Sequence, residues 1–230
     1  MNISVVVPVL NEAVLIREFL VDLCDRAPKA EIIVVDGSSS DRTTEFAAGR
    51  CDRLLQTAPG RARQMNAGAY IAKGDVVWFL HVDARIPDNA IADIEYALRD
   101  RDVIGGFFRI RLPRAGFIYR LSDCFAHYAG LLLRVRYGDH GFFCRREIFE
   151  KIDGFPEVAL MEDADFFRKL RRAGRIAVIS RRIVVNPRRY ERIGPSRLTL
   201  AFGLIGLLYL LHAPRQLLQV IYRRTCCQSS

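Results

Sequence analysis

The chain has 230 residues, half of them hydrophobic, so it can build one α/β domain with a substantial core and is too apolar to be disordered. Its net charge of +9, carried mainly by arginine, favours an anionic partner such as a nucleotide diphosphate, a nucleic acid or an acidic membrane face. The six cysteines show no metal-ligand spacing and no secretion signal precedes the first strand pattern, which together predict a cytoplasmic protein with reduced thiols.

Strand patterns and amphipathic helix patterns alternate over the first hundred residues. Strands are predicted at 3–7, 31–35, 54–55 and 75–80, and helices from 11, from 43, at 60–72 and at 88–99. The helix from 43 is expected to be capped by Ser40 or Asp41. Regular β-α alternation of this kind predicts an α/β fold with a doubly wound, mostly parallel sheet, right-handed crossovers and helices on both faces.

The second half of the chain follows a less regular pattern. Strands are predicted at 105–112, 142–144 and 176–185, and helices at 117–134 and 163–172, the last of them ended by Gly174. The apolar stretch 198–211 has about 14 residues, fewer than the ~20 that a spanning helix needs, and Pro214 follows it. Three arrangements are open for this stretch: a helix packed on the core, a helix lying in a membrane interface, and a span. Neighbouring arginines keep the membrane-surface arrangement open.

Acidic side chains lie near the ends of three predicted strands. Glu12 follows the first strand, Asp36 ends the second, and Asp83 follows the fourth. In an open α/β sheet, ligands bind at the edge formed by the carboxyl ends of such strands. A carboxylate at Asp36 can accept hydrogen bonds from a base or a ribose, and one at Asp83 can hold a divalent cation against a diphosphate. Taken alone, Asp36 is equally well a turn former and Asp83 a helix cap.

Two arginines, Arg61 and Arg63, begin the helix predicted at 60–72. A guanidinium suits phosphate oxygens, although a solvated helix face explains either arginine by itself. Together with the acidic side chains on successive connections of one sheet, the arginines predict a nucleotide-diphosphate site.

The sequence around these residues resembles the inverting glycosyltransferases of family 2, which have the GT-A fold, over roughly residues 1–195. The matching segments are the opening loop 8–12, the uridine-binding loop 34–43, the basic segment 60–68, His81-Val82-Asp83 in place of an Asp-x-Asp metal motif, and the Glu-Asp motif within 161–166. The resemblance implies a GT-A domain with a nucleotide-binding half at 1–100 and an acceptor half at 101–195. C-terminal helices at 196–230 would follow that domain.

The resemblance also implies roles for single residues. The donor would be a UDP- or GDP-linked sugar, bound with Mg²⁺ or Mn²⁺ at Asp83. Asp163 would be the catalytic base, supported by Glu162, in one displacement that inverts the anomeric carbon. The acceptor would be a small molecule or a lipid carrier, and in the second case the protein would contact the inner face of the cell membrane. The donor-binding residues would be Pro8, Glu12, Asp36, Arg61, Arg63 and His81.

His81 departs from the family pattern, which has an acid at this position. A neutral imidazole can bond a ribose hydroxyl or ligate a metal, but it adds no negative charge, which favours weaker metal binding or a shift towards Mn²⁺. His140 is a candidate for a further ligand, for the acceptor pocket, or for a buried structural histidine. The His-x-Asp motif and the Arg-Arg-Tyr segment that contains Arg189 together resemble one bacterial subgroup of the family. We assign Arg189 to the acceptor side.

Two other functions fit part of the sequence. A nucleotidyltransferase would also use a parallel sheet and a metal carboxylate, but it would open with a Gly-rich, Arg-containing loop, which residues 8–12 lack. A weakened enzyme that only binds nucleotide sugars would fit the change at His81. Nucleic-acid binding is not expected, because no recognition motif is present and the aromatic residues are not interleaved with the basic ones.

Overall fold

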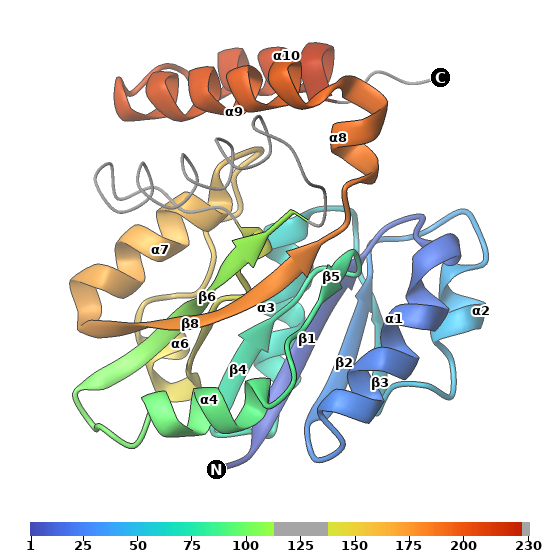
Figure 1. Cartoon of the computed structure of the whole chain (residues 1–230), viewed down its shortest axis with the longest axis vertical. Coiled ribbons are helices and arrows are strands. Elements are labelled where there is room, and N and C mark those ends of the chain that lie inside the picture. The colour runs from blue at the N-terminus through green and yellow to red at the C-terminus, as the bar shows by residue number, and fades with distance from the viewer. Residues whose placement is uncertain (113–137, 227–230) are drawn as a thin grey trace.

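One eight-stranded sheet organises residues 1–112 and 138–226, the part of the chain that the computed structural model describes (Figure 1). The strands are β1 (Ile3–Val9), β2 (Glu31–Asp36), β3 (Arg53–Gln56), β4 (Val76–Phe79), β5 (Ala84–Arg85), β6 (Val103–Arg111), β7 (Phe143–Arg145) and β8 (Arg175–Val185). Their order across the sheet is β3-β2-β1-β4-β7-β6-β8-β5. Strands β3, β2, β1 and β4 run parallel, as do β6 and β8, whereas β7 and β5 are antiparallel to their neighbours. The predicted α/β fold with a mostly parallel sheet is confirmed.

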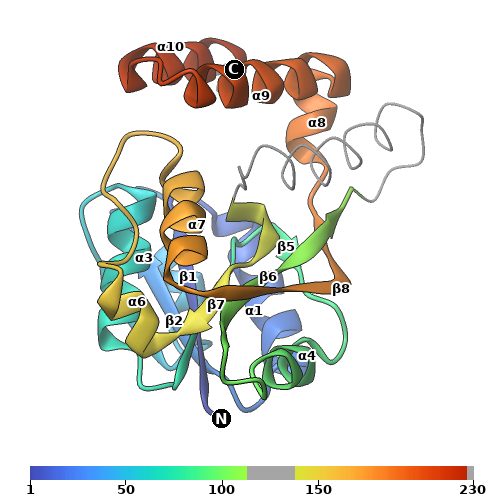
Figure 2. The same cartoon turned by 90° about the vertical axis from the view of Figure 1, so that its left-hand side faces the viewer.

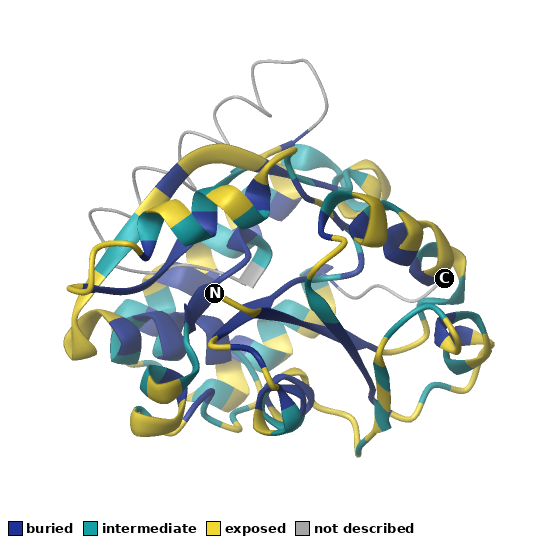
Figure 3. Ribbon diagram, turned by 90° about the horizontal axis from the view of Figure 1, so that it is seen from below, coloured by how far each residue is buried: buried dark blue, intermediate teal, exposed yellow. Residues whose placement is uncertain are grey.

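Helices cover both faces of this sheet (Figures 1 and 2). Helices α1 (Ala13–Arg26) and α4 (Ala90–Ala97) pack on one face, and α3 (Arg61–Ile71), α6 (Arg146–Lys151) and α7 (Glu162–Ala173) pack on the other. Along β1, Val5 and Val7 belong to the first core and Val6 to the second, because successive side chains of a strand point to opposite faces. Both faces are therefore covered, and strands β1 and β4 are buried along their whole length (Figure 3).

Two local predictions are corrected by the structure. Strand β1 continues through Pro8 to Val9. Val6 is the last residue of β1 that pairs with β4, and Pro8 lies beyond it, so the missing N–H of proline costs no hydrogen bond of that ladder. Helix α2 (Thr43–Ala47) has Arg42 at its N-cap position, without a side-chain cap. Asp41 instead accepts the backbone N–H groups of Thr43 at 3.0 Å and Ala13 at 3.1 Å, so it ties the start of α2 to the start of α1.

After β8 the chain forms α8 (Arg188–Ile193) and then two paired helices, α9 (Pro195–Leu210) and α10 (Arg215–Cys226), which we call the C-terminal hairpin. The hairpin lies across the top of the molecule in Figure 1. Helix α9 packs Ile205 and Tyr209 into a small core with Met161 and Ala164, and Leu198 into another with Cys226 of α10. Within residues 1–112 and 138–226, no helix combines the length and the hydropathy that crossing a bilayer requires. The helix predicted at 117–134 lies outside the described residues.

Candidate active site

The loops that follow β1 and β2 are held together by hydrogen bonds between backbone and side chains. Asn11, whose backbone has a φ of 54°, accepts the N–H of Ser40 with its side-chain oxygen at 2.8 Å. The N–H of Asn11 donates to Ser39 Oγ, also at 2.8 Å, and the N–H of Ser39 donates to Asp36 Oδ2 at 2.9 Å. The two loops therefore form one rigid edge at the carboxyl ends of these parallel strands.

Helix α3 is fixed to the same edge by a residue that the sequence analysis did not select. The buried side chain of Gln64 donates to the carbonyls of Val9 and Val35, each at 2.8 Å. Close packing helps, because a Cβ at Gly68 would lie 2.4 Å from Val6. These contacts set the rotation of α3 and aim Arg61, one turn before Gln64, over the strand ends.

The residues assigned to the donor lie along this edge. Pro8 is buried near the end of β1, and Asp36 is fully buried at the end of β2, where Ser39 donates to both of its carboxylate oxygens. Asp36 thus stabilises the loop that follows β2, at the same edge of the sheet. Glu12 stands at the start of α1 with its carboxylate 3.5 Å from Arg188 Nη2. Burial raises the pKa of Glu12, and the positive charge of Arg188 opposes part of that rise.

The two arginines of α3 point in different directions. Arg61 Nη1 lies 3.7 Å from Asp163 Oδ2 and 3.8 Å from Glu162 Oε1. Arg63 instead pairs with Glu157 at 2.9 Å, in a solvent-exposed contact. Residues two apart on a helix face nearly opposite sides, so only one of the pair can turn towards the acids. The structure brings Arg61, and not Arg63, to the predicted Glu-Asp motif.

Both members of that motif lie in the first turn of α7. Glu162 is 7% exposed and Asp163 is 5% exposed, which is unusual for carboxylates. Both stand at the positive end of the helix dipole, beside the guanidinium of Arg61. Helix α7 therefore presents two acids next to a cation, at the edge where the donor loops end.

Asp83 and His81 follow β4, in a field set by charges from four other elements. Burial, and after it the nearby carboxylate of Asp139, raises the pKa of Asp83 to about 6 against the opposing charges of Arg189 and Arg61. Burial lowers the pKa of His81 to about 3, and the positive charge of Arg61 acts in the same direction. His81 is therefore a neutral imidazole at physiological pH. Asp139, in the short 3₁₀ helix η1 (Gly138–His140), was missed by sequence reasoning, although it is the residue before His140.

The residues present fit a divalent cation that arrives together with a diphosphate. In the described part of the chain, no three His, Cys, Asp or Glu side chains form a ready-made metal cage. Mg²⁺ does not need one, because it is usually held by one or two carboxylates and by substrate phosphates. The pKa of Asp83 is raised mainly by burial and then by the charge of Asp139, and a bound cation would oppose both effects.

The two residues assigned to the acceptor side have different surroundings. His140 is buried with its Nδ1 atom 2.9 Å from the carbonyl oxygen of Phe108. A carbonyl only accepts, so Nδ1 carries a proton and donates this hydrogen bond. Arg189 donates from Nη1 to the hydroxyl of Tyr222 at 3.4 Å, and its charge lowers the pKa of Asp83. The chain thus brings α8 and α10 close to the predicted metal residue.

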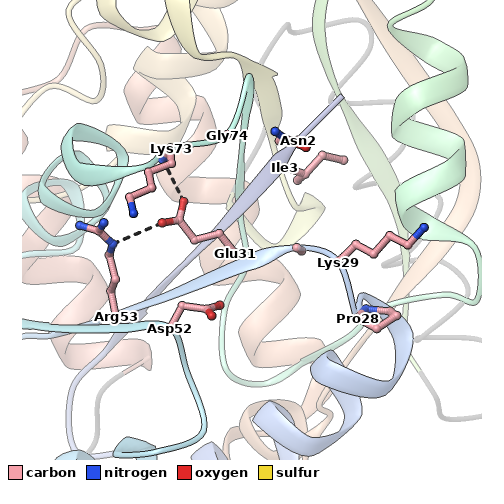
Figure 4. Close-up of a pocket in the computed structure, with 10 residues that line it drawn as sticks. Asn2, Ile3, Pro28, Lys29, Glu31, Asp52, Arg53, Lys73 and Gly74 are labelled. Carbon is pink, nitrogen blue, oxygen red and sulfur yellow. Dashed lines mark hydrogen bonds and ion pairs between the residues drawn. The ribbon is translucent and has the colours of Figure 1, made fainter.

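A separate hollow of about 590 Å³ lies at the opposite ends of β1 and β2 (Figure 4). Its central carboxylate, Glu31, is already engaged by Arg53 at 3.3 Å and by the N–H of Lys73 at 2.8 Å. Ligands of open α/β sheets bind at the carboxyl ends of parallel strands, and this hollow is at the amino ends. We therefore assign the chemistry to the edge that carries Asp83 and Asp163.

Comparisons with known proteins identify the family of this chain. A sequence profile of the family described as "Glycosyl transferase family 2" matches residues 4–153. The chain belongs to glycosyl transferase family 2. It is 36% identical over 132 residues to undecaprenyl-phosphate 4-deoxy-4-formamido-L-arabinose transferase of Pectobacterium carotovorum, covering 52% of this chain and 39% of that protein. It is 27% identical over 190 residues to the probable glycosyltransferase YdaM of Bacillus subtilis, covering 71% of this chain and 45% of that protein. This family 2 chain thus spans less than half the length of either relative.

Solved structures share its fold. A mannosyltransferase from Pyrobaculum calidifontis, in complex with GDP-mannose and Mn²⁺, superposes with a TM-score of 0.66 at 22% identity, over 97% of this chain and 69% of that one. Glucosyl-3-phosphoglycerate synthase from Mycobacterium tuberculosis, in complex with Mn²⁺, UDP and glucosyl-3-phosphoglycerate, gives 0.63 at 21% identity, over 93% and 81%. The predicted GT-A fold is therefore confirmed for this family 2 chain.

Proposed function

We propose that this protein is an inverting glycosyltransferase that moves a sugar from a UDP- or GDP-linked donor to an acceptor hydroxyl. One observation carries the proposal: Arg61, from the helix that begins at the donor loops, lies 3.7 Å from Asp163. A group suited to the leaving diphosphate and a group suited to the attacking hydroxyl thus meet at one edge of the sheet. A displacement at the sugar carbon needs those two functions side by side.

The donor half of the site would bind through the connected loops after β1 and β2. Asp36 would accept hydrogen bonds from the base or the ribose, and Glu12 and the backbone at Pro8 would line the same edge. His81, as a neutral imidazole, would bond a ribose hydroxyl. Arg61 would neutralise the diphosphate, whereas Arg63, paired with Glu157, would have to leave that contact to take part.

Mg²⁺ or Mn²⁺ would be held by Asp83, with His81 and Asp139 in the surrounding field. Such an ion stabilises the negative charge that develops on a departing diphosphate. Mn²⁺ suits this set better than Mg²⁺ because it accepts a nitrogen ligand more readily. The solved neighbours crystallised with Mn²⁺ support the same choice.

Asp163 would be the catalytic base. Its carboxylate would take the proton of the acceptor hydroxyl while the oxygen forms a bond to the anomeric carbon. The bond from that carbon to the diphosphate would break in the same step, on the opposite face, so the configuration inverts. Arg61 places a positive charge beside the carboxylate of Asp163. Glu162, next to it and also near Arg61, would support the acceptor.

The acceptor would be a lipid carrier or a small molecule, bound near His140 and Arg189. Two observations favour the lipid. A relative is named for transfer involving undecaprenyl phosphate, and the C-terminal hairpin exposes a stripe of leucines beside arginines. The protein would then work at the inner face of the cell membrane. We retain the division into a catalytic domain at 1–195 and C-terminal helices from 196 as part of this proposal.

Asp163→Asn tests the base assignment. We expect release of UDP or GDP from UDP-glucose or GDP-mannose, in Mn²⁺, to fall by about 10²–10⁴-fold, because proton transfer is lost. Binding of UDP or GDP, measured by calorimetry, should remain near the wild-type value. Asp102→Asn, at an exposed aspartate away from the site, is the matched control. Turnover by Asp163→Asn at the control's level would refute the assignment. A protein that binds donor but never releases nucleotide diphosphate, with or without Asp163, would instead be the weakened nucleotide-sugar binder.

A further inference from the structure

Helix α7 carries a third acid, Asp165, which faces away from the donor edge. Asp163 and Asp165 are two residues apart, so their side chains leave α7 on nearly opposite sides. Asp163 lies beside Arg61 of α3, whereas Asp165 meets the C-terminal hairpin. The first turn of α7 is therefore held from both sides.

The contact with the hairpin is short and uses both oxygens of Asp165. Tyr209 of α9 donates its hydroxyl to Oδ1 at 2.6 Å, and Arg215 of α10 donates from Nη2 to Oδ2 at 2.6 Å. The other terminal nitrogen of Arg215 donates to the carbonyl of Leu160 at 2.7 Å. The guanidinium of Arg215 thus joins the end of the loop before α7 to the first turn of α7. Two donors held in a fixed fork are what arginine offers for such a bridge.

Packing reinforces these polar contacts. Met161 and Ala164 are buried in one small core with Ile205, Tyr209 and Leu218 of the hairpin. The guanidinium of Arg215 also lies over the ring of Tyr209, 4.9 Å from its centroid. Figures 1 and 2 both show the hairpin beyond the end at which α7 begins. We call Asp165, Tyr209 and Arg215 the α7 clamp.

The backbone just before the acids needs such support. Met161, the N-cap residue of α7, has a φ of 70°, in the left-handed region that side chains other than glycine adopt at a cost. Residues held there keep that conformation only where the surroundings fix it. Glu162 and Asp163 follow directly, so their position depends on what holds Met161.

We propose that the α7 clamp positions the catalytic base, so that the C-terminal hairpin is part of the active-site scaffold rather than an appendage. This inference rests on the proposed role of Asp163. Asp165, Tyr209 and Arg215 are positioning residues, because they act through α7 and touch the hairpin rather than the reacting atoms. The same hairpin also contacts Arg189 of α8, through the hydroxyl of Tyr222 on α10.

Tyr209→Phe tests the clamp with little change in packing, since it removes only the hydroxyl. We expect the turnover number for nucleotide-diphosphate release from UDP-glucose or GDP-mannose in Mn²⁺ to fall by about tenfold to a hundredfold. The KM for the donor and the affinity for UDP or GDP should stay within about twofold, because the donor loops are untouched. Asp165→Asn should behave alike, and the double variant should lose less than the product of the two single losses.

Two controls separate positioning from stability. Tyr96→Phe removes the hydroxyl of an exposed tyrosine on α4, and Ile94→Val weakens the core on the far face of the sheet. Hydrogen exchange provides a readout that does not depend on the donor. Amides at 161–166 should exchange faster in Tyr209→Phe than in either control, while those of α4 do not.

The outcomes distinguish the clamp from the base. If Tyr209→Phe and Asp165→Asn match Ile94→Val in turnover and in exchange at 161–166 while Asp163→Asn is inactive, the clamp is wrong and the base stands. If Asp163→Asn keeps full turnover, the base assignment on which the clamp rests is refuted. Arg215→Lys gives an independent check, because it keeps the charge but cannot bridge Leu160 and Asp165, and it should also lower turnover.

Discussion

His81 is the residue at which this chain differs most from the pair of acids expected in its family. It is held neutral by burial and by Arg61, next to an Asp83 whose pKa burial and Asp139 already raise to about 6. The site thus carries less negative charge than a second carboxylate would give it. We therefore expect the site to bind a free cation more weakly than a site with two carboxylates would. We also expect less repulsion between its acidic groups when no cation is bound.

His81→Asp should reverse that balance. Without metal, a second buried carboxylate next to Asp83 should lower the melting temperature by on the order of 5 °C, through like-charge repulsion and desolvation. The shift produced by Mn²⁺ should be larger than in the wild type, because the cation then neutralises an additional charge. Thermal unfolding in EDTA and in Mn²⁺ measures both effects. His212→Asp, at an exposed histidine, is the control. A Mn²⁺ shift no larger than that of the wild type would contradict the assignment of Asp83 to the metal.

Tyr209 predicts a pH effect on stability. Burial raises its pKa to about 12 from the ordinary value of 10.0, and the hydrogen bond to Asp165 adds to the rise. The folded-state pKa lies above the unfolded one, so the fold favours the protonated phenol. This contribution is complete below about pH 10 and is lost as the pH rises through about 12. Denaturant unfolding from pH 9 to 12 should show less alkaline loss in Tyr209→Phe than in Tyr96→Phe. Equal loss in both would exclude the effect.

At the scale of elements, the sequence predicted the parts of the fold whose side chains follow a simple local pattern. Strands β1, β2 and β4 are buried on both faces, so their apolar runs and the acids that end them could be read directly. The two-residue strand β5 has no such run, and the antiparallel pairing of β7 with β4 and β6 depends on contacts distant in sequence. No local pattern encodes such pairings.

The same distinction explains which site residues were found. The helical period indicates that Arg61 and Arg63 face different sides of α3, but only the bonds of Gln64 to the ends of β1 and β2 decide which one faces the acids. Asp139 comes near Asp83 because η1 lies beside the end of β6 and β8, an arrangement made by tertiary pairing. The partners of Asp165 lie 44 and 50 residues further along the chain, so its role was invisible to pattern reading.

At the scale of the whole molecule, the C-terminal hairpin has two opposed faces. The inner face holds α7, and the outer face exposes leucines and a valine at helical spacing: Leu200, Leu204, Leu207 and Leu211 on α9, and Leu217 and Val220 on α10. Exposed arginines, Arg197, Arg223 and Arg224, lie on the same two helices. An apolar stripe accompanied by cations suits the surface of an anionic bilayer, and the net charge of +9 acts in the same direction.

We expect the protein to sediment with vesicles of phosphatidylglycerol and phosphatidylcholine, and far less with phosphatidylcholine alone. Replacing Leu204 and Leu207 by serine should weaken binding about tenfold or more, because each leucine contributes about 1 kcal/mol or more when it enters the interface. Val14→Ser with Val21→Ser removes two exposed apolar side chains from α1 instead, and should leave binding unchanged.

Reversing the charge at Arg223 and Arg224 should abolish the preference for phosphatidylglycerol, at about 1 kcal/mol for each arginine near the surface. If the leucine variant binds vesicles like the wild type, or if the wild type forms dimers that this variant does not, the stripe contacts protein rather than lipid. The clamp that joins this hairpin to α7 is unchanged in the leucine variant. That variant should therefore keep its turnover on a soluble donor although its binding to vesicles is weakened.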